Sequence, residues 1–188
     1  MRAYCKYVKR AGLTLENKKI NILISKDQIS ERIEQLGAEI SKDYFGKNLY
    51  VLSLLRGSFI YTADLVRQIT VPTKIGFMTT SSYENAEESL GLVNIVNDVP
   101  DNISGFDVLI VDDIVDTGLT MSFVMEHVKS LGAASVKTCV LLNKIERRTV
   151  EIAPDYCCFD IPDLFVVGYG LNYGDYYRNI PYIFNWED

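Results

Sequence analysis

The chain predicts an α/β fold in which a central parallel sheet is flanked by helices. Two apolar runs, Leu49 to Leu55 and Val108 to Val111, are typical of strands that are covered on both faces. Each run is followed by a segment with apolar residues at helical spacing, and this alternation indicates βαβ units. The 188 residues and their 48% hydrophobic content suit one core, so we expect a single domain over residues 1–188.

The amino-terminal half begins this alternation. A helix over Ser25 to Tyr44 is indicated by apolar residues at helical spacing, which we expect in the core: Ile29, Ile33, Leu36 and Ile40. The other expected elements of this half are strands at 20–24, 49–55 and 73–78 and a helix at 58–69. Thr79 to Glu88 is polar and has neither helical nor strand periodicity, so we expect a mobile loop there.

The carboxyl-terminal half continues the pattern and then changes character. Its expected elements are strands at 92–96, 106–111 and 135–142 and a helix at 117–131. Beyond residue 150 the chain is richer in aromatic residues and glycine, and shorter strands are expected at 156–160, 164–167 and 182–184. We expect residues 150–188, together with residues 1–20, to form a small hood over the edge of the sheet.

Composition excludes several classes of function. A formal net charge of −6 and a pI near 4.9 argue against a broad nucleic-acid-binding surface. No apolar run approaches the roughly 20 residues that span a bilayer, and the amino terminus lacks the apolar stretch of a signal peptide, so we expect a cytoplasmic protein with no membrane partner. His127, the only histidine, is expected on a helix surface, and the cysteines are expected to be free thiols that bind no zinc: Cys5, Cys139, Cys157 and Cys158.

The most informative segment runs from Val108 to Met121, where a buried strand leads into two acids and a turn. The turn combines hydroxyl groups with a glycine that lets backbone approach a ligand closely: Thr117, Gly118 and Thr120. Because a helix start presents unpaired N–H groups at the carboxyl edge of a parallel sheet, a phosphate fits there. Asp112 and Asp113 would repel that phosphate unless they face hydroxyls and a divalent cation, and a ribose 5-phosphate meets both demands.

This motif resembles the phosphoribosyl pyrophosphate (PRPP) signature of the type I phosphoribosyltransferases. The resemblance implies that Asp112 and Asp113 hold the ribose hydroxyls and Mg²⁺. It also assigns the binding of the 5-phosphate to the turn formed by Thr117, Gly118, Leu119 and Thr120, and it includes Asp116 among the residues that bind the substrate. A purely structural alternative is a helix start capped by Asp116 or Thr117, which leaves the adjacent acids unexplained.

A second motif, Leu54 to Ser58, lies where an expected strand ends and resembles the pyrophosphate-binding loop of hypoxanthine-guanine phosphoribosyltransferases. The residues that match this loop are Leu55, Arg56 and Gly57. In that family the peptide bond that corresponds to Leu55–Arg56 can be cis. Arg178 matches the family's pyrophosphate-binding arginine. The alternatives are a loop with one exposed arginine and, for Arg178, a surface salt bridge to Asp175.

The purine-binding residues implied by this resemblance are Lys144, Phe165, Val166 and Asn172. Lys144 would donate to O6 of the base, and because lysine is only a donor, it accepts a 6-oxopurine and leaves a 6-amino base mismatched. Phe165 would stack on the base and Val166 would meet its edge through backbone groups. The alternatives are a solvated Lys144 and a Phe165 that packs in the core.

Asn172 is a departure from the family, whose members usually carry Asp at this position. The Asp helps to hold a second Mg²⁺ and meets the edge of the base. Asn keeps the oxygen ligand but loses the charge, so weaker binding of Mg²⁺ or guanine is expected at Asn172.

The resemblance covers residues 22–183 and implies a purine-salvage enzyme that uses Mg²⁺ to transfer the phosphoribosyl group of PRPP to hypoxanthine or guanine. It implies that Asp116 is the general base toward N7 and that Ser82 and Tyr83 cover the closed site. The acidic segment 84–91 is expected to affect closure. Family members tend to form homodimers or homotetramers.

Three alternatives stay open at this point. A phosphoribosyltransferase for xanthine or a pyrimidine would share the PRPP motif, although Lys144 with Phe165 favours a 6-oxopurine. A regulatory, RNA-binding relative would need a basic face, which the acidic composition disfavours. An inactive relative is disfavoured because the acids and the turn are intact.

Overall fold

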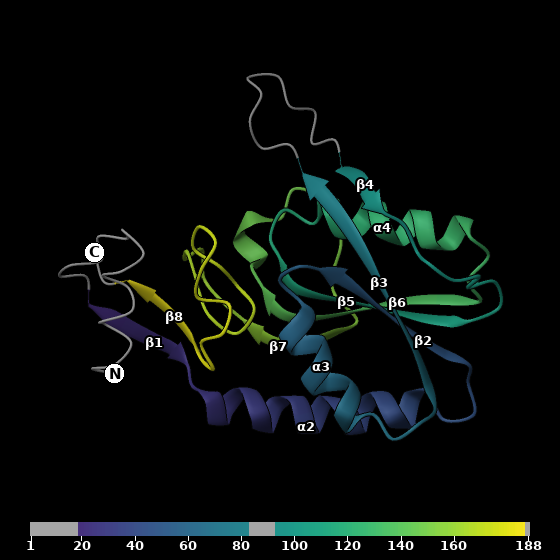
Figure 1. Ribbon diagram of the computed structural model, residues 1–188, viewed down its shortest axis with the longest axis horizontal. Coiled ribbons are helices and arrows are strands. Elements are labelled where there is room, and N and C mark those ends of the chain that lie inside the picture. The colour runs from purple at the N-terminus through teal and green to yellow at the C-terminus, as the bar shows by residue number, and fades with distance from the viewer. Residues whose placement is uncertain (1–18, 83–92, 187–188) are drawn as a thin grey trace.

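The computed structural model describes residues 19–82 and 93–186, which form two sheets and the helices around them (Figure 1). The elements are, in chain order, β1 (Ile20–Ile24), α2 (Lys26–Asp43), β2 (Leu49–Leu55), α3 (Phe59–Gln68), β3 (Thr73–Ser82), β4 (Val93–Asn97), β5 (Asp107–Val115), α4 (Leu119–Ser130), β6 (Ser135–Asn143), the 3₁₀-helix η1 (Ile145–Arg147), β7 (Tyr156–Asp160) and β8 (Ile183–Trp186). The larger sheet has six strands in the order β4-β3-β2-β5-β6-β7. All its neighbouring strands are parallel except β3 and β4, and this confirms the predicted α/β fold.

Alternate residues of the central strands pack into two separate cores. On β5, Leu109 and Val111 join residues of α2 and α3 on one face of the sheet, whereas Val108 and Ile110 join residues of α4 on the other. All four side chains are fully buried, as expected for strands that helices cover on both faces. The carboxyl ends of β2, β5, β6 and β7 therefore meet at one edge of a rigid layer.

The start of helix α2 is set by local sequence. The Ser25 hydroxyl accepts a hydrogen bond from the N–H of Gln28 at 3.3 Å, and Gln28 Oε1 accepts from the N–H of Ser25 at 2.9 Å. This reciprocal pair is a capping box, which satisfies N–H groups that the helix itself leaves unpaired. The predicted core residues of the helix are confirmed, since each is at most 2% exposed: Ile29, Ile33, Leu36 and Ile40.

A small hood lies beside the main sheet, with β1 and β8 as its antiparallel strands (Figure 1). Its predicted extent over residues 150–188 is wrong for β7, which pairs with β6 as an edge strand of the main sheet. The strand predicted at 20–24 is confirmed. The strand predicted at 164–167 is wrong, because only Val167 pairs, in an isolated bridge to Phe184 of β8. Val167 and Phe184 also belong to a separate hydrophobic cluster inside the hood. Residues 1–18, which were predicted to contribute to the hood, lie outside the described residues.

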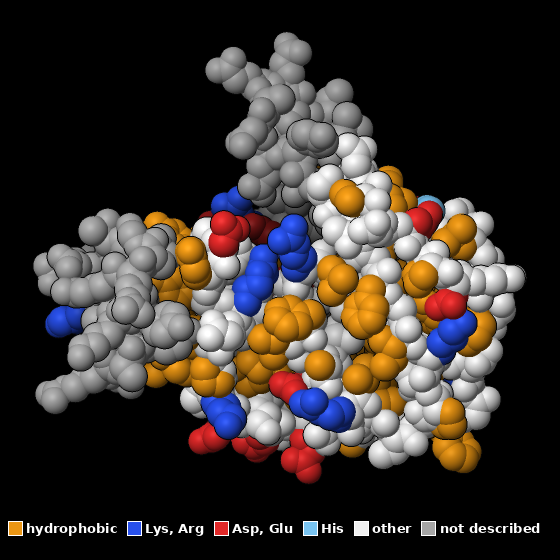
Figure 2. All heavy atoms as spheres, viewed as in Figure 1, with side chains coloured by type: hydrophobic (Ala, Val, Ile, Leu, Met, Phe, Trp, Pro, Cys, Tyr) orange, Lys and Arg blue, Asp and Glu red, His pale blue; other side chains and the backbone are white. Residues whose placement is uncertain are grey.

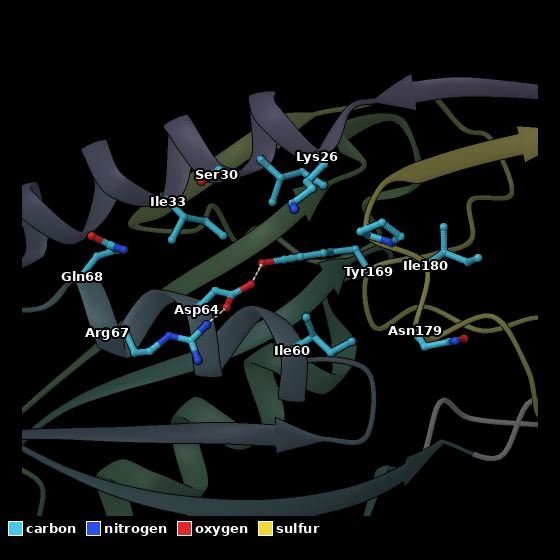
Figure 3. A pocket seen from close by; sticks show the side chains of 12 residues that line it. Lys26, Ser30, Ile33, Ile60, Asp64, Arg67, Gln68, Tyr169, Asn179 and Ile180 are labelled. Atoms are coloured by element: carbon cyan, nitrogen blue, oxygen red, sulfur yellow. Dashed lines mark hydrogen bonds and ion pairs between the residues drawn. The ribbon is translucent and has the colours of Figure 1, made fainter. Parts of the chain in front are cut away.

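A cavity of about 390 Å³ lies in the seam between α2, α3 and the hood (Figure 3). The Tyr169 hydroxyl donates a hydrogen bond to Asp64 of α3, and Arg67 forms an ion pair with the same carboxylate. Asp64 therefore connects the hood to α3, and Arg67 is its counter-ion. None of the predicted site residues lines this cavity.

Strand β3 is longer than predicted. It continues to Ser82, so the loop expected over 79–88 is wrong for its first four residues. Thr80 and Ser81 pair with β4, and this partner strand supplies the hydrogen bonds that fix an extended conformation in a polar sequence. The remainder of the expected loop, from residue 83 to residue 88, lies outside the described residues.

The elements around the acidic motif also differ from the prediction. β5 continues past Val111 through both acids to Val115, because these residues still pair with β6. Helix α4 begins at Leu119, two residues after the predicted start. Among the described residues, no helix has the length and apolar character needed to cross a membrane.

Candidate active site

The turn between β5 and α4 is held from outside the helix. The N-cap of α4 is Gly118, which has φ 88° and no side chain with which to cap the helix. A Cβ at Gly118 would come within 2.6 Å of Ile152 and 2.8 Å of Val150, so both conformation and space require glycine. The Thr117 carbonyl accepts a hydrogen bond from the Thr149 N–H at 3.0 Å. The N-cap is therefore Gly118 and not Asp116 or Thr117, although the Thr117 hydroxyl accepts a long hydrogen bond of 3.4 Å from the Leu119 N–H. The other N–H groups of the first turn suit an anion.

Asp112 and Asp113 lie side by side on β5 with no basic partner. Burial raises the pKa of Asp112 well above its usual range, and the negative charge of Asp113 raises it further. Burial also raises the pKa of Asp113, although hydrogen bonds from nearby groups and the charge of Arg178 oppose the rise. Neither acid forms an ion pair within the described part of the chain. Two adjacent, desolvated carboxylates that form no ion pair suit a hard divalent cation.

A cation at this place would need further oxygen ligands. Within residues 19–82 and 93–186, no three side chains of His, Cys, Asp or Glu are grouped to hold a metal ion. Mg²⁺ keeps several waters and is commonly held by one or two carboxylates together with phosphate oxygens of a substrate. The acid pair therefore fits a metal that arrives with a phosphorylated ligand.

The loop after β2 faces the acid pair directly. The Leu55–Arg56 peptide bond is cis, as the family resemblance implied. A Cβ at Gly57 would lie 1.7 Å from Asp113 Oδ2, so only glycine lets this loop lie against the acid. The side chain of Arg56 is exposed at the same edge.

Buried hydroxyl groups of β2 and α3 and of the residue between the loop and α3 hold this loop in place. Ser53 Oγ lies 2.8 Å from Ser58 Oγ and 2.7 Å from Thr62 Oγ1, and the Ser58 hydroxyl also donates to the Leu54 carbonyl. These three side chains are at most 2% exposed. None of the three was predicted to support the site, although a polar residue inside an otherwise apolar strand is a signal that could have found Ser53.

Arg178 contacts the hood backbone and not the predicted alternative partner. Its Nη1 donates to the Gly170 carbonyl at 2.6 Å, and the Gly170 N–H donates to the Arg178 carbonyl at 2.9 Å. A Cβ at Gly170 would lie 2.1 Å from the Gly57 carbonyl oxygen, so the two glycines pack together. The surface salt bridge between Arg178 and Asp175 is therefore wrong. Arg178 lies close enough to Asp113 for its charge to affect that carboxyl.

Four charged side chains form a chain of ion pairs beyond β6. Lys144 is only 8% exposed, so the alternative of a solvated lysine is wrong. Lys144 Nζ lies 3.4 Å from Asp163 Oδ1, and Arg147 Nη1 lies 3.6 Å from Asp163 Oδ2. Arg147 Nε lies 2.8 Å from Asp116 Oδ1. The structure thus brings Asp116 and Lys144 together through two residues that the sequence analysis did not assign to the site.

The residues predicted to meet a purine lie on the next segment. Phe165 is 61% exposed, so the alternative of a core phenylalanine is wrong. Val166 is buried with its side chain in the main core, which leaves its backbone for a ligand. The Asn172 amide nitrogen donates to the Gly174 carbonyl. Ser82 ends β3, and Tyr83 and residues 84–91 lie outside the described residues.

Comparisons with known proteins agree with this geometry. The phosphoribosyl transferase domain family matches residues 24–174 of the chain. The hypoxanthine-guanine phosphoribosyltransferase of Streptococcus pneumoniae is 47% identical over 169 residues, covering 90% of this chain and 94% of the relative. The hypoxanthine phosphoribosyltransferase of Haemophilus influenzae is 46% identical over 167 residues, covering 87% and 93%.

A solved structure gives the same result. The hypoxanthine phosphoribosyltransferase of Staphylococcus aureus superposes with a TM-score of 0.85 at 40% sequence identity, covering 89% of this chain and 91% of that one. The acid pair, the glycine turn and the cis peptide thus lie in a chain whose fold and sequence both match this group of enzymes. The chain belongs to the hypoxanthine-guanine phosphoribosyltransferases, within the phosphoribosyl transferase domain family.

Proposed function

We propose that this chain is a single catalytic domain that transfers the 5-phosphoribosyl group of PRPP to hypoxanthine or guanine, giving IMP or GMP and pyrophosphate. The observation that carries the proposal is the meeting of three features at one sheet edge. These are the uncompensated acids Asp112 and Asp113, the anion-binding turn at Gly118, and the cis Leu55–Arg56 loop packed on Asp113. Each binds a different part of PRPP.

The ribose and its phosphates divide among these features. The start of α4 binds the 5-phosphate through backbone N–H groups and through hydroxyl groups of the turn, with the following residues as ligands: Thr117, Gly118, Leu119 and Thr120. Asp112 and Asp113 accept hydrogen bonds from the ribose hydroxyls. Arg56 and Arg178, with the backbone of Leu55 and Gly57, bind the pyrophosphate and offset its charge in the transition state.

Mg²⁺ completes the charge balance of this arrangement. Asp112 and Asp113 would hold one Mg²⁺, and Asn172 would contribute an oxygen ligand to a second. When bound, Mg²⁺ would neutralise part of the charge on the departing pyrophosphate. Because the Asn172 amide nitrogen is engaged by the Gly174 carbonyl, its oxygen is the atom left for a metal. An Asp here could not donate that hydrogen bond, so Asn172 exchanges a charge for a fixed orientation.

The base lies between Lys144 and the Phe165 segment. Lys144 donates to O6, Phe165 stacks on the ring, and the backbone of Val166 meets the far edge. Because a buried ammonium can only donate, adenine places its 6-amino donor against another donor. Discrimination of this kind reaches about 10⁴-fold in sites built to bond a specific group.

In the transfer step, purine N9 forms a bond to C1 of the ribose while the bond from C1 to the pyrophosphate oxygen breaks. Asp116 accepts the proton that leaves N7 as the base becomes neutral. Arg147 pairs with Asp116 in this structure, so the arriving base must compete with Arg147 for the carboxylate. An Asp116→Asn enzyme is expected to bind both substrates and turn over slowly, and near-wild-type turnover would remove Asp116 from this role.

Ser82 and Tyr83 cover the reacting centre and exclude water in this proposal. If so, a Tyr83→Ala enzyme hydrolyses PRPP faster than wild type in a single turnover without base. An unchanged hydrolysis rate would count against a covering role for Tyr83.

The test of function offers PRPP and Mg²⁺ with hypoxanthine, guanine, xanthine, adenine or uracil separately, and separates the products by chromatography. We expect nucleotide from hypoxanthine or guanine and almost none from adenine. Nucleotide from uracil alone would point to a pyrimidine enzyme. Silence with every base would favour a regulator that binds PRPP without turnover, for which RNA retention on a filter at low salt is the next assay.

We further propose a cytoplasmic homo-oligomer, a homodimer or homotetramer, that needs neither nucleic acid nor membrane. Figure 2 shows hydrophobic side chains gathered over α3 and β3, and three of them are large and exposed: Phe59 at 45%, Ile75 at 41% and Phe77 at 49%. An exposed apolar patch of this kind marks an interaction surface. Phe77→Lys is expected to lower the mass measured by light scattering, whereas Phe45→Lys at an isolated exposed position should not.

A further inference from the structure

An antiparallel bridge in the hood lies next to an aromatic pair at the purine-binding segment. Val167 and Phe184 exchange two backbone hydrogen bonds, with N···O distances of 2.9 and 3.0 Å, in an antiparallel bridge. Phe165 and Trp186 lie two residues outward from this isolated bridge on their respective chains, where the backbone pairing does not continue. The rings of Phe165 and Trp186 are nearly parallel, with an interplanar angle of 15° and centroids 6.3 Å apart.

Trp186 is itself held firmly in place. Its ring has edge contacts with Tyr173, Tyr177 and Phe184, at centroid distances of 4.8, 6.3 and 5.4 Å. Its backbone belongs to β8, where it pairs with Ile20 of β1. The indole therefore has little freedom to turn, and it offers a fixed flat surface to its neighbour.

Phe165, in contrast, is exposed and lies on a segment without regular secondary structure. Its ring is 61% exposed, and its other aromatic contact is an edge contact with Tyr173 at 6.0 Å. A phenyl ring with this exposure can rotate among several orientations, and ordering it on binding has an entropic cost. A parallel indole on one face restricts those orientations and leaves the opposite face for a ligand.

We propose that Trp186 is a positioning residue for purine binding, which it supports by holding the ring of Phe165 parallel to the base. The proposal rests on the proposed function, because it needs a purine on the free face of Phe165. Trp186 does not contact the base itself. It acts by reducing the loss of conformational freedom that Phe165 undergoes on binding. Its removal should therefore weaken binding of the base and leave binding of PRPP unchanged.

The test compares Trp186→Ala with Tyr182→Ala. Tyr182 belongs to the same hydrophobic cluster and contacts Phe184 at 6.0 Å, so its loss also weakens the hood without removing a ring beside Phe165. An aromatic pair contributes about 0.5–1.5 kcal/mol, which corresponds to roughly two- to tenfold in affinity. We expect Trp186→Ala to raise the KM for hypoxanthine by about that factor while the KM for PRPP stays within about twofold.

Conservative variants separate positioning from general destabilisation. Trp186→Phe, which keeps a flat ring, should restore most of the affinity for hypoxanthine, whereas Trp186→Leu, which keeps apolar volume without a ring, should not. If Trp186→Ala fails to fold, the comparison of Trp186→Phe with Trp186→Leu is sufficient to test the proposal. A wild-type KM for hypoxanthine in the Leu variant, an equal rise in Tyr182→Ala, or a parallel rise in the KM for PRPP would overturn the proposal. Failure of the proposed function differs, since the wild-type enzyme itself would then be silent.

Discussion

Replacing Gly57 by alanine is the perturbation whose effect follows most directly from the coordinates. The new Cβ would lie 1.7 Å from Asp113 Oδ2 and 2.5 Å from its Cγ. Non-bonded carbon and oxygen atoms approach to roughly 3.5 Å at their energy minimum. Because the buried hydroxyls and the packing of Gly170 against the Gly57 carbonyl hold the loop, Asp113 must retreat, and it must do so by more than about 1 Å.

The magnitude of the expected loss comes from this displacement. A misplacement of about 1 Å in a positioning group costs on the order of 10²-fold in rate. We therefore expect Gly57→Ala to lower kcat/KM for PRPP about 100-fold, which corresponds to about 2.7 kcal/mol of transition-state stabilisation. The effect on folding should be smaller, about 1 kcal/mol, because Asp113 can change its rotamer at the cost of one strained torsion.

The assay is steady-state nucleotide formation with PRPP varied at saturating hypoxanthine, with thermal unfolding followed in parallel. Gly46→Ala is the matched control. A Cβ at Gly46 meets nothing within 4 Å, but its φ of 76° makes alanine strained, so the control loses stability and keeps its kinetics. A Gly57→Ala enzyme with wild-type kcat/KM for PRPP would refute the argument that this loop positions Asp113.

Three further predictions concern folding and the thiols. Ser25→Ala removes the capping box of α2 and should lower the free energy of unfolding by about 1 kcal/mol with no change in turnover, as a urea titration would measure. Tyr169→Phe removes the bond from the hood to α3 and should lower it by about 1–3 kcal/mol, and an unchanged urea midpoint would contradict that link. Because burial raises the pKa of Cys157 to about 12 and of Cys158 to about 11, both thiols stay protonated at pH 8 in the folded state. Burial also raises the pKa of Cys139 well above its usual range, so a Cys5→Ser variant, which keeps these three thiols, should react with iodoacetamide only after unfolding. Rapid labelling of the folded protein would contradict the raised pKa values.

Local patterns in the sequence were enough to predict the parts of the fold that local forces decide. The helix predicted over Ser25 to Tyr44 is α2, which agrees within one residue at each end, and its four predicted core residues are buried. The acid pair Asp112–Asp113 and the glycine turn were equally readable, because strand, turn and helix follow one another without interruption. The prediction failed where pairing with another segment determines the secondary structure. Thr80, for example, was expected in a loop but lies in a strand because it pairs with β4.

The same limit applies to the site. Arg147 and Asp163 connect Asp116 to Lys144 through ion pairs. Asp116 and Asp163 are far apart along the chain, and only the meeting of β5, β6 and the Phe165 segment brings these side chains together. No periodicity marks such a contact. The pairing of Trp186 with Phe165 likewise depends on strand register across the hood, which the short carboxyl-terminal strands do not reveal in advance.

The most direct test of the central claim measures pyrophosphate release from PRPP, Mg²⁺ and hypoxanthine by wild type and by the double variant Asp112→Asn with Asp113→Asn. We predict turnover by wild type and a loss of at least about 10³-fold in the variant. Because burial raises the pKa of both acids, neutral replacements should leave the melting temperature unchanged or higher, so the loss would be chemical and not a failure to fold. Substantial turnover by the folded double variant would contradict the assignment of the transfer to this edge of the sheet.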